Sequence, residues 1–120
     1  MAAVPEVGGG AQVKTSDALQ AARARIEDPV HWKIGAGFDG GGACCSVTAL
    51  VECWPYHYGT GVVAAVTLDS AAVVICGDRS EGSELRPAAW VNDYMGHAAA
   101  LEMFDIDIAI SMALSDEAAE

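Results

Sequence analysis

The segment from His97 to Leu114 constrains the fold more than any other part of the sequence. It contains neither glycine nor proline and is rich in alanine, leucine and methionine, which favours an α-helix. Within it, however, residues 104–110 alternate between apolar and other side chains, as a half-buried strand does. A helix here has two apolar faces, so it has to lie centrally and pack on both sides. Asp107 falls between those faces and, if buried, needs a hydrogen-bond partner.

Two further helices are predicted, each ended by a proline. Residues 16–27 form a good helical sequence before Pro29, with an apolar face made of Leu19, Ala22 and Ile26. Residues 44–54 precede Pro55, and their spacing predicts a core-facing stripe made of Val47, Leu50, Val51 and Trp54.

The stretch at 61–76 is rich in valine, which favours two short strands. Asp69 and Ser70 between them fit either a hairpin turn or, with Asp69 as the cap, the start of a short helix. The fold class that we predict is mainly α, a compact small helical domain. The alternative is an α+β fold with a short hairpin at 61–76 and a strand at 104–110. Residues 1–13 are predicted to form a flexible N-terminal arm, residues 14–115 a single globular domain, and residues 116–120 an acidic tail.

The charge is strongly negative and unevenly placed. The net charge is −11, and the last 40 residues hold nine acidic side chains and one basic side chain. Such a field disfavours nucleic acid and anionic membranes and favours a basic protein partner. We recognise no signal peptide and no apolar run long enough to span a bilayer, so we expect a cytoplasmic protein.

Cysteine usage agrees with that location and indicates no bound cofactor. In a reducing compartment Cys44, Cys45, Cys53 and Cys76 are expected to be thiols and not disulfides. Neither the cysteines nor the histidines have the spacing of a zinc site. We therefore predict no metal and no cofactor.

One set of side chains has the composition of a nucleophilic site. Cys45 falls at the start of a predicted helix, where the helix dipole favours a thiolate. His97 has the chemistry of a general base, and Asn92 or Asp93 just before it is able to orient an imidazole. In the alternative interpretation these residues have no catalytic role: Cys45 is a buried core residue, His97 is half-exposed, and Asn92-Asp93 is an ordinary turn or helix cap.

Three sequence elements resemble a family of short bacterial and phage proteins known as a domain of unknown function. The first is Ile26-Glu27-Asp28-Pro29 followed by Trp32 and Gly35. The second is the cysteine that opens Cys45-Ser46-Val47-Thr48-Ala49-Leu50. The third contains Trp90, Asn92, Asp93, His97 and the pair Phe104-Asp105, with Val91 separating Trp90 from Asn92. The resemblance implies a helix through Phe104-Asp105 and implies no activity.

We therefore carry two functional hypotheses forward. The first is a non-enzymatic interaction or regulatory module whose acidic C-terminal third meets a basic partner. The second is a cysteine-dependent hydrolase or acyltransferase that uses Cys45, His97 and either Asn92 or Asp93.

Overall fold

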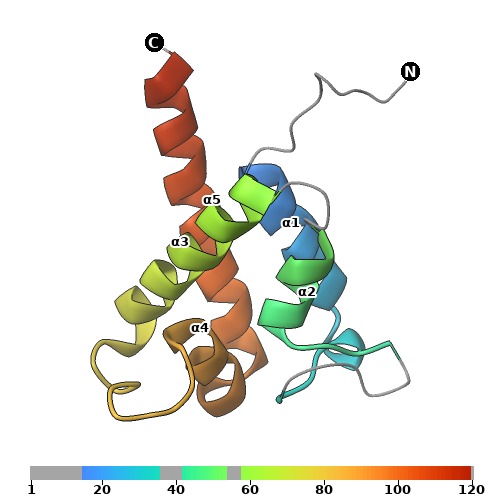
Figure 1. The fold of residues 1–120 in the computed structure, drawn as a ribbon. Coiled ribbons are helices and arrows are strands. Elements are labelled where there is room, and N and C mark those ends of the chain that lie inside the picture. Colours follow the sequence, from blue (N-terminus) through green and yellow to red (C-terminus); the bar gives the residue numbers. More distant parts are fainter. Residues whose placement is uncertain (1–14, 36–41, 54–57, 120) are drawn as a thin grey trace.

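The computed structural model describes residues 15–35, 42–53 and 58–119, and the predicted arm at 1–13 lies outside them. The predicted mainly α class is confirmed. The helices are α1 (Thr15–Ile26), α2 (Ser46–Cys53), α3 (Tyr58–Cys76), α4 (Pro87–Trp90) and α5 (His97–Ala119). A 3₁₀ turn, η1 (Pro29–His31), follows α1, and a π-helical turn, η2 (Val91–Met95), connects α4 to α5. In Figure 1, α1 and α2 lie side by side while α3 crosses α5.

The α+β alternative is wrong because residues 61–76 lie within α3 and residues 104–110 lie within α5. Asp69 and Ser70, the expected turn, sit inside α3, and the Ser70 hydroxyl donates to the carbonyl oxygen of Val66 at 3.2 Å. α3 packs against α1, α2, α4 and α5. An isolated hairpin is marginal in water, whereas a helix packed on several neighbours buries its small apolar side chains. Tertiary packing therefore outweighs the strand preference of valine.

The end of α3 is well defined. Gly77 follows it with a φ of +61°, a conformation that glycine adopts at low cost. The guanidinium of Arg79 donates to the carbonyl oxygens of Ile75 and Cys76, each at 2.9 Å. These bonds satisfy carbonyl groups that the helix itself leaves without a partner.

The predicted helix at 97–114 is confirmed, and α5 continues to Ala119. Its first half is packed as expected, with Met103 and Phe104 fully buried. Farther along, Ile110, Met112 and Leu114 are 41%, 48% and 55% exposed, so the second half is not enclosed on both sides by the described residues. No helix in the described ranges is both long enough and apolar enough to cross a membrane.

The apolar face predicted for the first helix is confirmed, since Leu19, Ala22 and Ile26 are all fully buried in α1. The stripe predicted for residues 44–54 is wrong in part. Leu50 is buried, but Val47 and Val51 are exposed, and Trp54 lies outside the described residues. The buried face of α2 consists instead of Ser46, Ala49 and Leu50. The backbone N–H and the hydroxyl of Ser46 both donate to the Oδ1 of the buried Asn92, so the first residue of the helix faces the interior.

Candidate functional site

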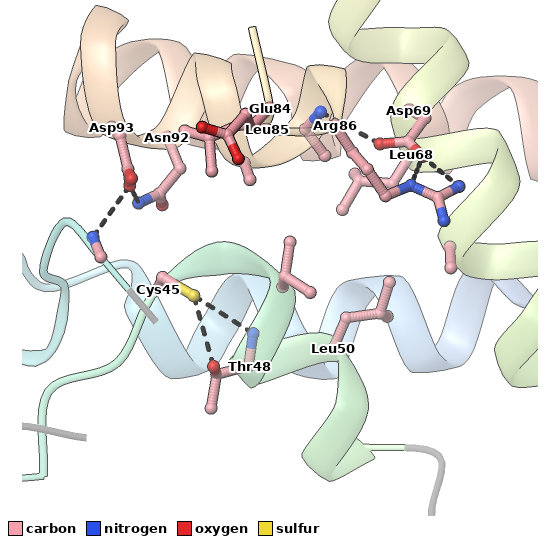
Figure 2. A pocket seen from close by; sticks show the side chains of 15 residues that line it. Cys45, Thr48, Leu50, Leu68, Asp69, Glu84, Leu85, Arg86, Asn92 and Asp93 are labelled. Atoms are coloured by element: carbon pink, nitrogen blue, oxygen red, sulfur yellow. Dashed lines mark hydrogen bonds and ion pairs between the residues drawn. The ribbon is translucent and has the colours of Figure 1, made fainter. Parts of the chain in front are cut away.

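A pocket of about 370 Å³ lies between α2, α3 and the segment that forms α4 and η2 (Figure 2). Its walls are mainly aliphatic, formed by Val47, Leu50, Ala65, Leu68, Leu85, Ala88 and Ala89. Polar side chains gather at its two ends: Cys45, Asn92 and Asp93 at one, Asp69 and Arg86 at the other, with Glu84 between them. Apolar walls with a few fixed polar groups are the usual form of a ligand-binding pocket.

Asp69 forms one end of the pocket by capping α4 from a different helix. Its Oδ1 accepts a hydrogen bond from the backbone N–H of Ala88 at 3.0 Å. Its Oδ2 accepts from the Nε of Arg86 at 2.7 Å and lies 2.6 Å from the Nη2. The N–H of Ala88 lies in the first turn of α4, where the helix supplies no acceptor. Asp69 therefore links two walls of the pocket, α3 and α4.

Asn92 forms the other end, and its side chain takes part in five hydrogen bonds. It is 1% exposed, and its Oδ1 accepts from the Nε1 of Trp32 at 2.7 Å. The same oxygen accepts from the backbone N–H and the hydroxyl of Ser46, at 3.0 Å and 2.7 Å. Its Nδ2 donates to the carbonyl oxygen of Lys33 at 3.1 Å and to Asp93 at 2.9 Å. Asn92 thus ties η2 to the N-terminus of α2 and to the loop after η1.

Asp93 extends this network to the same loop. Its Oδ1 accepts from the backbone N–H of Gly35 at 2.9 Å. Gly35 has a φ of +79°, which residues other than glycine rarely adopt. Asn92 and Asp93 were predicted to orient an imidazole, but in the structure their hydrogen bonds shape the loop that follows Trp32.

Cys45 lies at the start of a helix, as predicted, and acts as its cap. Its Sγ accepts from the backbone N–H of Thr48 at 3.4 Å and lies 3.3 Å from the Thr48 hydroxyl. The residue is 7% exposed, and its side chain is one of those that line the pocket. The neighbouring Cys44 is fully buried, and this burial raises the pKa of its thiol despite the opposing effect of Arg25.

His97 is the first residue of α5 and is not among the residues that line the pocket. Its Nε2 lies 2.7 Å from the carbonyl oxygen of Ile26, so this nitrogen carries a hydrogen and donates it. Its ring packs on Trp32, with 5.3 Å between the ring centroids. The structure therefore brings Cys45, Asn92 and Asp93 to one pocket and places His97 against α1 and Trp32.

The three sequence elements of the family resemblance meet in this region. Trp32 bonds to Asn92, and His97 packs on Trp32 while bonding to Ile26. These motif residues hold the loop, η2 and the start of α5 in place.

Sequence reasoning missed the end of the pocket that contains Leu68, Asp69 and Arg86. Asp69 falls where a turn was one of the expectations, and no role was predicted for Arg86. A signal was present, because Asp69 is the one charged residue in the apolar stretch 61–76. A charge that persists in such a stretch needs a partner from another part of the fold.

Among the described side chains, no three from His, Cys, Asp and Glu are grouped closely enough to hold a metal ion. Comparisons with family models, with curated proteins and with solved structures found no match for this chain.

Proposed function

We propose that this chain is a non-enzymatic interaction module that binds a basic partner by taking one of its apolar groups into the pocket. The observation that carries this proposal is the pairing of aliphatic walls with an acidic edge. Three carboxylates, from Asp69, Glu84 and Asp93, and one guanidinium, from Arg86, line the pocket.

The charge of the whole chain supports a partner of this kind. With a net charge of −11, the protein attracts cationic surfaces over a distance, and screening by salt weakens that attraction. The apolar walls supply a contribution to binding that salt does not screen, because it comes from removing apolar surface from water. The best occupant is therefore an aliphatic or aromatic side chain next to lysine or arginine.

The contacts of the described residues do not favour the alternative of a cysteine-dependent hydrolase or acyltransferase. Such an enzyme needs an imidazole nitrogen within reach of the cysteine sulfur. Here the Sγ of Cys45 contacts Thr48, while the Nε2 of His97 contacts the carbonyl oxygen of Ile26.

Cys44, Cys45 and Cys76 are unpaired thiols, in line with the reducing, cytoplasmic location that remains a prediction.

The test uses two matched synthetic peptides and two matched variants. One peptide is an amphipathic helix of leucine and lysine, and the other replaces every lysine with glutamate. Ala89→Phe fills the pocket from its α4 wall, whereas Ala109→Phe adds the same ring at an exposed position on α5. Calorimetry should show that the lysine peptide binds and that salt weakens this binding. It should also show that Ala89→Phe abolishes binding and Ala109→Phe retains it.

Two outcomes would contradict the proposal. Equal affinity for the lysine and glutamate peptides would show that the acidic edge does not select the partner. Undiminished binding to Ala89→Phe would show that the peptide sits on another surface.

A further inference from the structure

Asp107 is a buried carboxyl group in the interface between α3 and α5, outside the pocket. It is fully buried, and its Oδ1 has no hydrogen-bond partner among the described residues. The hydroxyl of Ser111, one turn farther along α5, lies close enough to this carboxyl to lower its pKa but forms no hydrogen bond of good geometry with the described residues. An ionised carboxylate left in this state is costly, because burial removes the water that would stabilise its charge.

The contacts of Thr67 indicate which form of Asp107 the interface accommodates. The Oγ1 of Thr67 lies 3.1 Å from the carbonyl oxygen of Ala64 and 3.1 Å from the Oδ2 of Asp107. A hydroxyl has a single hydrogen and donates it to one acceptor at a time. If Asp107 is protonated, its own O–H donates to Thr67, and Thr67 donates to Ala64. If Asp107 is ionised, only one of the two contacts remains a hydrogen bond.

Among the described residues, no charged side chain shifts the pKa of Asp107. Burial raises the pKa of Asp107 to about 6, and the opposing effects come from the hydroxyls of Thr67 and Ser111 alone. Of the charged side chains on the packed helices, Arg23 of α1 pairs with Asp105, and Asp69 of α3 pairs with Arg86.

The same turn of α3 connects this interface to the pocket. Thr67 lies between Ala65 and Leu68, which line the pocket, and is followed by Asp69, which caps α4. A movement of α3 away from α5 therefore displaces one pocket wall directly and the α4 wall through Asp69.

We propose that the proton on Asp107 regulates the pocket: the neutral carboxyl holds α3 against α5 in the arrangement described here, and ionisation loosens that contact and weakens binding in the pocket. The proposal rests on the proposed function only in taking the pocket as the binding site. The regulating ligand is the proton itself, because it binds more tightly to the arrangement in which α3 packs against α5 than to the loosened one.

The test combines a binding measurement with a structural one. The neutral fluorescent probe N-phenyl-1-naphthylamine reports on the pocket without sensing the charge of the carboxylates at its edge. Its affinity should fall by about fivefold or more between about pH 5 and about pH 7.5, within the usual range of coupling between two sites. NMR of the full chain should show the Asp107 carboxyl and the amides of Leu68 and Ala88 titrating with one midpoint.

Two variants separate the effect of Asp107 from other effects of pH on the protein. Asp107→Asn, which keeps the shape and removes the ionisation, should bind the probe equally at both pH values. Glu102→Gln, an exposed position on the same helix, should retain the pH dependence.

Persistence of the pH dependence in Asp107→Asn would overturn the proposal. So would titration of the carboxyl without any response from Leu68 and Ala88. If the amides respond but the probe binds at no pH, the proton-linked movement stands and the pocket fails as a binding site.

Discussion

Replacing Asp107 with asparagine should change how the stability of the protein depends on pH. The carboxyl has an ordinary pKa of 3.8 and a pKa of about 6 in the fold, so the folded state holds this proton more tightly than the unfolded state. Its contribution to stability is fully present below pH 3.8 and is lost as the pH rises through about 6. A difference of about two pKa units corresponds to roughly 3 kcal/mol.

Asparagine is neutral at every pH and therefore removes this dependence. One amide N–H of the variant has Thr67 as an acceptor. A second amide N–H that stays without an acceptor in this buried interface costs about 1–3 kcal/mol. The variant should thus be less stable than the parent at about pH 3.5 and equally or more stable at about pH 7.5. Relative to the parent, its free energy of unfolding should rise by about 3 kcal/mol over that range.

Urea unfolding followed by tryptophan fluorescence measures this difference directly. Asp105→Asn is the matched control, because that carboxylate is exposed on the same helix and pairs with Arg23 at the surface. It should cost less than about 1 kcal/mol. If the difference between Asp107→Asn and the parent is the same at every pH, Asp107 does not carry the proton in the folded state and the reasoning is wrong.

Three further substitutions test the contacts around the pocket. Asn92→Ala leaves the indole N–H of Trp32 and the backbone N–H of Ser46 without their acceptor. It should therefore lower the free energy of unfolding in urea by about 3 kcal/mol or more, and a loss below about 1 kcal/mol would contradict the hydrogen-bond network. Cys45→Ser keeps a capping atom, so its stability in thermal unfolding should stay within about 0.5 kcal/mol of the parent, whereas Cys45→Ala should lose about 1 kcal/mol. Equal stabilities of Cys45→Ala and the parent would show that the sulfur does not cap α2. Gly96→Ala meets no atom within 4 Å, so its cost of about 1–3 kcal/mol comes from the backbone at φ +96°; an unchanged melting temperature would contradict that strain.

Local chemistry was sufficient to predict the helices whose sequences carry their own start, stop and periodicity. The stretch 16–27 has a cap, high helical propensity and a proline stop, and α1 spans Thr15–Ile26. In the C-terminal segment the pattern was ambiguous, because propensity favoured a helix and the alternation at 104–110 favoured a strand; the family resemblance decided for the helix, and the structure has α5 there. The residues Cys45, Asn92 and Asp93 were also singled out in advance, and all three line the pocket.

Their roles were not predictable in the same way. Cysteine, asparagine and aspartate have the same functional groups in a catalytic site and in a cap or loop contact, and only their distances to partners distinguish these roles. The sequence places His97 near Asn92 along the chain. It does not say that the imidazole reaches Ile26, which precedes it by 71 residues.

The tertiary structure also decided what the valine-rich stretch would become. By itself the sequence determined that residues 61–76 are apolar, and either a hairpin or a helix places part of such a stretch against the core; in the structure Val66, Val73 and Val74 stay exposed. The choice depended on the surfaces available, since a helix at this position packs on α1, α2, α4 and α5. Once α3 forms, Asp69 and Thr67 in one turn face different neighbours: Asp69 caps α4, and Thr67 contacts Asp107. Hydrophobicity is additive along a chain and is visible in its sequence, whereas the partner of a buried polar group depends on which elements the fold brings together.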